Sequence, residues 1–292
     1  MLRGLYTAAA GMIAEQRRHD TINNNIANLL TPGFKGGNVV NRSFPEMLVS
    51  LMNGGEGTST SSIGRMNTGV LAEENPIQFT QGDLQETGNP MDVAIESDIQ
   101  VPGMIFDAAG KYVSADGQVT FQPQALFTLL NPDGGQRYTR NGKFTLNEQG
   151  ELLAANGYKV LGTDGRPIVI NPQITQVNVT SEGQLIDGLT NRPIADANGQ
   201  PLSLLLSRIE NPNLLLAEGN GSFLLSDPNT ARPVTPQDQV TVRQGYIERS
   251  NVDPTQSMAE MMAALRAYEA NQKVIQYYDR SLDKAVNEVG RV

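Results

Sequence analysis

Both ends of the chain show hydrophobic periodicity typical of helices. Near the N-terminus apolar positions recur every three or four residues, and the pattern stops at Thr31-Pro32-Gly33, where proline cannot continue a helix. A longer stripe starts at Met258, just after Asp253-Pro254, which has the form of an N-cap followed by a first-turn proline. This stripe runs as far as Gly290. The sequence therefore predicts a long helix at each end.

The apolar stripes of these helices are the candidate contact surfaces. The C-terminal stripe follows a heptad whose d positions are all apolar, whereas two of its a positions, Gln272 and Asp279, are polar. Polar a positions weaken a helix seam but disfavour slipped registers. We expect this seam to join subunits, the alternative being that the helix packs on its own β domain. The predicted seam consists of Leu5, Met12, Ile26, Leu30, Met258, Met261, Leu265, Tyr268, Gln272, Ile275, Asp279, Leu282, Val286 and Val289.

The middle of the chain alternates short β-prone runs with turn residues. Asn or Asp followed by Gly occurs repeatedly, and this pair supplies the positive φ angles of type I′ hairpin turns. No helix-length periodic segment interrupts these runs, so the pattern favours an antiparallel β domain and a fold of the α+β class. The Asx-Gly pairs are at 116–117, 133–134, 141–142, 156–157, 164–165, 187–188, 198–199 and 220–221.

Four segments follow from these patterns. We assign residues 1–33 to the N-terminal helix, 34–79 to an extended connector, 80–248 to the central β domain and 249–292 to the C-terminal helix. Within the connector, residues 53–69 are rich in Gly, Ser and Thr and nearly devoid of apolar side chains. We interpret the first residues as part of the helix and not as a cleaved leader, because the apolar spacing continues through polar residues.

Composition and charge exclude several classes of function. The net charge is −9, which disfavours binding to nucleic acid or to an anionic membrane. The chain has no cysteine and one histidine, so neither a disulfide framework nor a Cys/His zinc site is expected. It has no nucleophile elbow, P-loop or dinucleotide fingerprint. His19 lies on a polar part of a predicted helix, and we interpret it as a solvent or packing residue. The sequence thus predicts no catalytic site, cofactor or metal.

Several motifs together resemble those of the flagellar rod and hook protein family. They are LYTAAAGM at 5–12, NNNIANLLTPGFK at 23–35, QGDL at 81–84, TGNPMDVAI at 87–95, YTRNGKF at 138–144, GELLAANGYKVLG at 150–162, QGYIERSNVDP at 244–254 and RAYEANQKVIQ at 266–276. They occur in the family's order and extend over nearly the whole chain. Within the family the chain is most similar to the distal rod protein and its Gram-positive rod-like relatives.

This resemblance implies a structural role. In the family the two terminal segments pair as helices in a coiled-coil-like manner and line an axial tube that transmits torque, and the β domain forms the outer layer. The implied partners are further copies of the chain, neighbouring rod and hook subunits, and the flagellar type III export apparatus. The implied location is the basal body, reached by export beyond the inner membrane without a cleaved signal peptide. One departure is an insertion at 99–124, which we expect to form an extra hairpin.

Three alternatives remain open at this point. The chain can be a hook or a proximal rod subunit instead of a distal rod subunit. A secreted β-rich carbohydrate-binding module is the alternative from another class, although the absence of Trp counts against it. In the isolated chain we expect a folded region near 80–248 and mobile ends, because an isolated helix is marginally stable without neighbours to cover its stripe.

Overall fold

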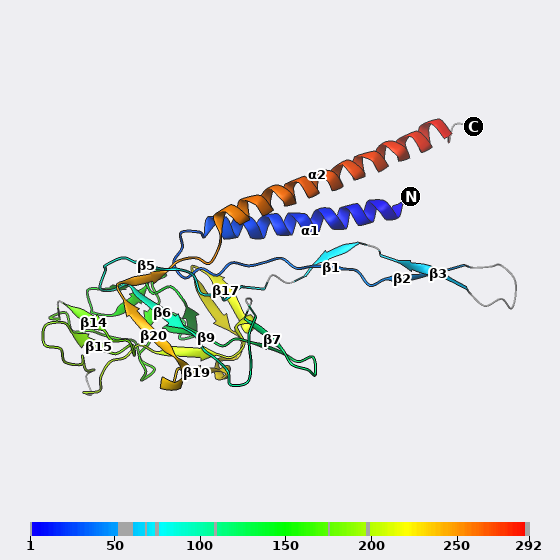
Figure 1. Cartoon of the computed structure of the whole chain (residues 1–292). Helices are drawn as coiled ribbons and strands as arrows, with labels where there is room; N and C mark the ends of the chain where they lie inside the picture. The colour runs from blue at the N-terminus through cyan, green and yellow to red at the C-terminus, as the bar shows by residue number, and fades with distance from the viewer. Residues whose placement is uncertain are drawn as a thin grey trace. The chain divides into compact units, whose positions relative to one another are not determined.

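The computed structural model describes residues 2–51, 61–67, 69–73, 76–107, 110–174, 176–196 and 199–289. The chain divides into two compact units. The helical unit consists of Met1–Ala27, Gly37–Pro76 and Asp253–Val292, and the β unit consists of Asn28–Gly36 and Ile77–Val252. One helix lies at each end of the sequence, and every strand pairing among the described residues is antiparallel (Figure 1). The predicted α+β class with mainly antiparallel strands is confirmed.

Two long helices dominate the helical unit. Helix α1 (Leu2–Ala27) and helix α2 (Pro254–Lys284) lie side by side, and they run in opposite directions (Figure 1). A π-helical turn, Ala285–Val289, follows α2. The two terminal helices thus contact one another within a single chain.

Both predicted helix boundaries can be compared with the structure. At the start of α2, Asp253 accepts hydrogen bonds from the backbone N–H groups of Thr255 (2.7 Å) and Gln256 (3.2 Å), which confirms the predicted N-cap. Helix α1 ends at Ala27, earlier than the apolar spacing predicts. Beyond it, the Gly33 N–H donates to the Glu248 carbonyl at 2.8 Å, so this segment bonds to the β unit. The predicted stop at Gly290 lies outside the described residues.

The helical unit also contains two short antiparallel pairs between residues 41 and 72. Strand β1 (Asn41–Ser43) pairs with β4 (Val70–Ala72), and β2 (Met47–Leu51) pairs with β3 (Ser61–Met66). The segment expected to be an extended connector therefore contains strands. Residues 53–60 and 68 of its Gly/Ser/Thr-rich part lie outside the described residues.

A nine-stranded sheet is the main element of the β unit. The unit also contains smaller two-stranded pairs. Three 3-10 turns (Pro212–Leu214, Pro228–Thr230 and Pro236–Asp238) lie between the later strands of the unit. The strands of the unit are β5 (Leu84–Glu86), β6 (Val93–Ser97), β7 (Lys111–Val113), β8 (Val119–Phe121), β9 (Gln124–Leu130), β10 (Gln136–Thr139), β11 (Phe144–Leu146), β12 (Leu152–Ala154), β13 (Lys159–Val160), β14 (Val177–Val179), β15 (Leu185–Asp187), β16 (Leu206–Ile209), β17 (Leu215–Gly219), β18 (Ser222–Leu225), β19 (Ala231–Pro233), β20 (Val240–Gln244) and β21 (Tyr246–Glu248).

Strand β9 is the centre of the large sheet. One edge of β9 pairs with β10, while its other edge pairs first with β16 and then with β13. Phe127 belongs to the larger apolar cluster and Leu126, on the opposite face, belongs to a second one. Burial on both faces explains why this strand reads as a nearly continuous apolar run instead of an alternating one.

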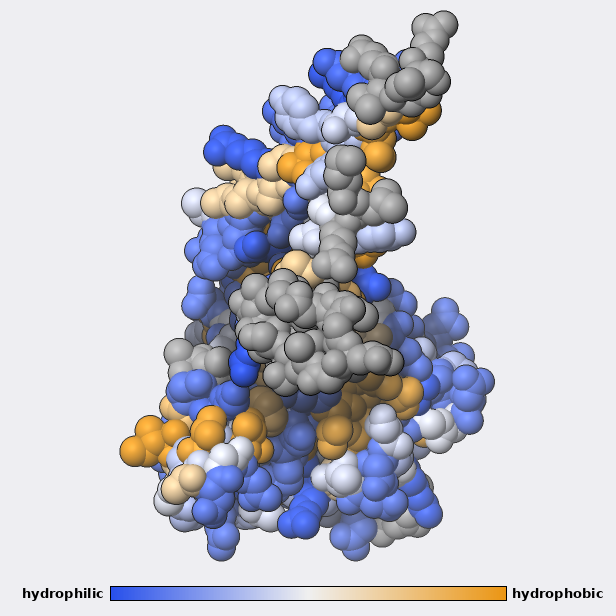
Figure 2. Space-filling model, turned by 90° about the vertical axis from the view of Figure 1, so that its right-hand side faces the viewer, coloured by the Kyte–Doolittle hydropathy of each residue, from blue (hydrophilic) through white to orange (hydrophobic). Residues whose placement is uncertain are grey.

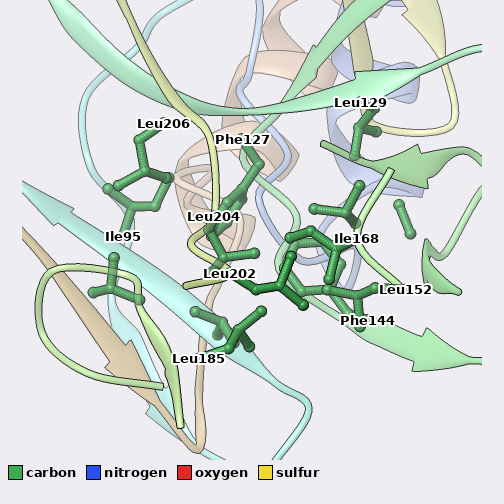
Figure 3. Close-up of a cluster of buried hydrophobic side chains, with 14 of the residues drawn as sticks. Ile95, Phe127, Leu129, Phe144, Leu152, Ile168, Leu185, Leu202, Leu204 and Leu206 are labelled. Atoms are coloured by element: carbon green, nitrogen blue, oxygen red, sulfur yellow. The ribbon is translucent and has the colours of Figure 1, made fainter. Parts of the chain in front are cut away.

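The larger apolar cluster, which includes Phe127 and Leu129 of this strand, is shown in Figure 3. The rings of Phe127 and Phe144 meet edge to face, with their centroids 5.0 Å apart. Leucines and isoleucines from several strands and loops surround them. The labelled members in Figure 3 are Ile95, Phe127, Leu129, Phe144, Leu152, Ile168, Leu185, Leu202, Leu204 and Leu206.

The Asx-Gly pairs mark turns, but the turn type differs from the predicted one at most of them. Only at Asn220-Gly221, between β17 and β18, do both residues have positive φ (52° and 71°), as a type I′ turn requires. At four further pairs (116–117, 133–134, 156–157 and 164–165) the glycine alone has positive φ, while Gly142 and Gly188 have no positive φ. Gly199 also has positive φ. Asn198 lies outside the described residues.

The insertion at 99–124 contains the expected hairpin. Strands β7 and β8 pair antiparallel, with Val113 opposite Val119. Phe106 and Tyr112 contact one another at its base, with ring centroids 6.5 Å apart. Ile105 is 90% exposed. The insertion thus contains a hairpin with an exposed apolar side chain, and it is anchored by Ile99, which is buried in the larger apolar cluster.

Candidate functional site: a helix pair and a buried charged clamp

Small residues on α1 allow α2 to approach closely. A Cβ atom at Gly4 would lie 2.1 Å from the Tyr278 hydroxyl oxygen, and one at Gly11 would lie 2.9 Å from Asn271 Nδ2. Ala8, between these glycines, is buried. Because these positions are three or four residues apart, they lie on one face of α1. The same face continues to Ile22, which is also buried.

The face of α2 toward α1 contains the d positions of the predicted heptad stripe but not its a positions. The d positions Met261, Tyr268, Ile275 and Leu282 are partly buried. A second row lies one residue before the predicted a positions: Ser257 and Ala264 are buried, and Asn271, Tyr278 and Ala285 are partly buried. Ser257 and Ala264 are small, so close helix approach selects them over the larger apolar residues that follow them.

The predicted a positions lie on the surface of this chain. Exposed fractions are 55% for Met258, 44% for Leu265 and 70% for Val286, and the polar Gln272 and Asp279 are also exposed. We call Met258, Met262, Leu265 and Val286 the outer stripe. Apolar surface on the helices is visible in the upper part of Figure 2. The outer stripe is thus open to solvent to a large extent in the single chain.

The predicted α1 members of the seam are not equivalent. Leu5, Met12 and Ile26 are partly buried within the helical unit. Leu30 is 90% exposed, and it lies beyond the end of the helix in the segment that belongs to the β unit. Val289 falls in the π-helical turn, and its side chain is outside the described residues.

A cluster of three charged residues is buried in the β unit, and we call it the charged clamp. Glu248 at the end of β21 accepts from Lys35 Nζ at 2.6 Å and from Arg140 Nε at 2.5 Å. All three side chains are at most 1% exposed. Buried charges are tolerated when every donor and acceptor is paired.

Neighbouring groups satisfy the remaining hydrogen-bonding capacity of the clamp. Lys35 also donates to the Thr80 carbonyl at 2.7 Å, and Glu248 accepts from the Gly82 N–H at 2.9 Å. Arg140 donates to the Ala125 carbonyl at 2.6 Å. The clamp therefore joins the incoming segment Asn28–Gly36, the sheet and the last strand of the unit.

Burial and pairing shift the pKa values of the clamp in a consistent way. Burial lowers the pKa of Lys35 to about 8, although Glu248 partly opposes this change. Burial would raise the pKa of Glu248, but the charges of Arg140 and Lys35 outweigh it, so the pKa lies below its ordinary value. The favoured state at neutral pH is one carboxylate between two cations.

Asn251 completes the attachment of the incoming segment. Its Oδ1 accepts from the Gly36 N–H at 2.8 Å, and its Nδ2 donates to the Gln78 carbonyl at 2.7 Å. Gly33 has φ of +68°, and a Cβ atom there would lie 2.5 Å from the Arg140 carbonyl carbon. Only glycine meets both requirements without strain.

The three residues of the charged clamp lie within the family motifs, but the sequence patterns indicate no role for them. Lys35, Arg140 and Glu248 are far apart in the sequence, and no local pattern connects them. The available signal was a single charge beside an apolar or β-prone run, as at Arg140 in YTRNGKF. Pairing partners separated by 108 and 213 positions emerge only from the fold.

The single histidine and the acidic side chains are the candidate metal ligands of this chain. No group of three or more His, Asp or Glu side chains among the described residues is placed to hold a metal ion. His19 lies on α1, where its Nδ1 is 3.0 Å from Asn23 Nδ2. None of the helices in the described part combines the length and apolar character needed to cross a membrane.

Comparison with known families and proteins agrees with the helix pair and the β unit. Residues 5–35 match the family described as flagella basal body rod protein, residues 122–186 match the flagellar hook protein FlgE/F/G D1 domain, and residues 243–288 match the flagellar basal body rod FlgEFG protein C-terminal family. These matches include both terminal helices and the centre of the large sheet.

Full-length relatives extend this likeness over the whole chain. The chain is 38% identical over 297 residues to the flagellar hook-basal body complex protein FlhO of Bacillus subtilis, with 100% of both chains covered. It is 31% identical over 298 residues to the flagellar basal-body rod protein FlgG of Borreliella burgdorferi, with 98% of both covered. It is also 28% identical to the rod protein FlgF of Mesorhizobium japonicum, with 99% of both covered. The resemblance drawn from the motifs is confirmed: the chain belongs to the flagellar basal-body rod and hook protein family.

Proposed function

We propose that the protein is a distal-rod-like structural subunit of the flagellar basal body, which polymerises through α1 and α2 into the axial tube that transmits torque. The observation that carries this proposal is the outer stripe. Its side chains are large and apolar, they repeat at helical spacing, and they are exposed in the single chain. Apolar surface of this kind indicates a contact with another molecule.

The two stripes of α2 give the helix two separate contacts. The stripe through Met261 and Ile275 is covered by α1, whereas the outer stripe through Met258 and Leu265 is free to contact a second copy. In this proposal the helices pair within one chain in a coiled-coil-like manner, and the outer stripe joins neighbouring chains. Burying each large side chain contributes about 1.5–3 kcal/mol before ordering costs.

Further copies of the chain and neighbouring rod and hook subunits are the proposed partners, and the basal body is the proposed location. Export through the flagellar type III apparatus, without removal of a leader, follows from the same assignment. We propose a structural and not an enzymatic role, because the observation that carries the proposal is an apolar surface suited to assembly. The hook and the proximal rod remain the alternative positions.

The test is a substitution in the outer stripe. Leu265→Asp places a charge where the proposed subunit contact excludes water, which costs several kcal/mol without a partner. We expect cells carrying only this variant to lose rods and motility, while the thermal transition of the purified chain stays close to that of the wild type. Motile cells with normal rods would overturn the proposal.

Ser281→Asp is the matched control. Ser281 is exposed on α2, at 100° per residue it lies on the side of the helix away from Leu265, and no arginine lies three or four residues from it. We expect this variant to assemble.

A second experiment addresses location. Electron microscopy of basal bodies that carry a label on the wild-type protein shows whether the protein lies in the rod or in the hook.

A further inference from the structure

Glu15 lines a notch between α1 and α2, and one of its carboxylate oxygens is unpaired. The notch has a volume of about 250 Å³ and lies between Glu15, His19 and Asp20 of α1 and Ala264, Leu265 and Tyr268 of α2. Glu15 Oε2 is buried and has no hydrogen-bond partner in the described part of the chain. A buried carboxylate oxygen without a donor is costly, so the notch is suited to receive a cationic donor.

A matching row of basic side chains lies on the other side of α2. Arg266, Lys273 and Arg280 are spaced by seven residues, and all are exposed. None of them forms an ion pair or a side-chain hydrogen bond among the described residues. We call these three residues the basic row.

The basic row of a chain cannot enter the notch of the same chain. Arg266 and Lys273 each follow by two positions a residue that faces α1, Ala264 and Asn271 respectively. Two positions correspond to a rotation of about 200°, so the basic row points away from α1. A cation that reaches the notch must therefore come from another molecule.

We propose that, in the assembled rod, a guanidinium of the basic row on one copy enters the notch of the next copy and pairs with Glu15. This inference rests on the proposed function, because the second molecule is another subunit. Arginine suits the site since its planar fork can donate to both carboxylate oxygens. Leu265 lines the notch and also belongs to the outer stripe, so the ionic contact is continuous with the proposed apolar contact.

The arrangement also explains how growth continues. The notch and the basic row are different surfaces on different sides of one helix pair, so their contact is heterologous. A heterologous contact that does not close a ring generates an open helical polymer. Each added copy fills one notch and offers a new one.

The experiment compares variants of the full-length chain in cells and as purified protein. Glu15→Gln keeps the size of the side chain and removes its charge. The double variant Arg266→Glu/Arg280→Glu reverses the charge of the basic row at exposed positions. We expect each to weaken self-association by about thirtyfold, which is typical of losing one partner of a desolvated charge pair. Rod formation should fall in parallel. Combining Glu15→Lys with the double variant restores opposite charges between copies and should recover rods.

The outcomes separate this inference from the proposed function. If Leu265→Asp stops assembly but the basic-row variant assembles like the wild type, the ionic contact is wrong and the rod assignment stands. If the labelled wild-type protein is absent from rod and hook, the proposed function fails. Should Glu15→Gln lower the thermal transition of the purified chain, the basic-row variant decides the matter, because its exposed side chains support no contact within the chain.

Discussion

The two units of this chain differ in how their most buried charged groups are paired. In the β unit, even the charged Lys35, Arg140 and Glu248 are buried and paired. In the helical unit, large apolar side chains such as Leu265 remain exposed, and Glu15 has an oxygen without a donor. The three buried charges of the clamp are therefore satisfied within a single chain, whereas Glu15 Oε2 and the outer stripe are not. The β unit has open groups of its own, since Arg208 Nε is buried without a partner among the described residues and Ile105 and Leu189 are exposed.

The strongest test of this comparison removes the centre of the charged clamp. Glu248→Ala leaves the buried cations of Lys35 and Arg140 without a carboxylate, and breaking a buried pair typically costs about 3–5 kcal/mol. We expect the free energy of unfolding of the β unit, measured with urea, to fall by that amount. Glu73→Ala is the control, since the Glu73–Arg42 pair is largely exposed and is worth at most about 1 kcal/mol. Equal losses in the two variants would contradict the role of the clamp.

The close packing of the β unit predicts a large effect at one glycine. A Cβ atom at Gly142 would lie 1.6 Å from the Val93 carbonyl oxygen, which belongs to the backbone and cannot rotate away. We expect Gly142→Ala to lower the free energy of unfolding by about 3 kcal/mol, the upper part of the range for overpacking. At Gly117 the added Cβ would meet open space, so Gly117→Ala should lose only the cost of a left-handed backbone, about 1–2 kcal/mol. Thermal unfolding of both variants and of the wild type measures the two losses of stability.

Within the helical unit, the two stripes of α2 should respond differently to the same change. Ile275 is partly buried toward α1, so Ile275→Asp should loosen the helix pair by about 2 kcal/mol. Leu265→Asp should leave it nearly unchanged, because Leu265 is 44% exposed in the single chain. Hydrogen exchange of the α1 amides in the purified chain measures this difference. Unprotected α1 amides in the wild type would instead support ends that order only on assembly.

The smallest expected effect is the pH dependence of the stability that Lys35 of the charged clamp contributes. Because the pKa of Lys35 is about 8 in the fold and near 10.5 when unfolded, the unfolded chain binds more protons between these values. Stability from this group is therefore present above pH 10.5 and is lost as the pH falls toward 8. Relative to Lys35→Met, the wild type should gain about 1 kcal/mol for each pH unit between 8 and 10. A difference that stays flat with pH would contradict the lowered pKa.

Sequence patterns predicted the elements of this fold better than their contacts. Helical spacing and the Asp253 cap located both helices, and turn residues identified the β region. The heptad register of α2 was predicted only in part. The more hydrophobic Leu265 was assigned to the seam, whereas the smaller Ala264 is the residue buried in the structure, because small side chains let two helices pack closely. The turn types were also missed, since Gly can take positive φ while the preceding Asx does not.

The charged clamp was beyond the reach of sequence patterns for a different reason. Its members are connected only by the path of the chain through the sheet, and each of them alone resembles an ordinary surface charge. The same holds for the notch, whose Glu15 lies on a helical face where the pattern alone indicates a solvated side chain. Burial, and not residue type, distinguishes these groups.

The sequence separation within the clamp has a consequence for the timing of folding. Lys35 meets Glu248 across 213 positions, and Gly36 meets Asn251 across 215. A chain made from its N-terminus must therefore be nearly finished before the segment Asn28–Gly36 finds its partners, and contacts of such long range form slowly. An export channel that takes hold of the leading end early would meet an unfolded polymer, and the β unit would close only after its last strand had passed through.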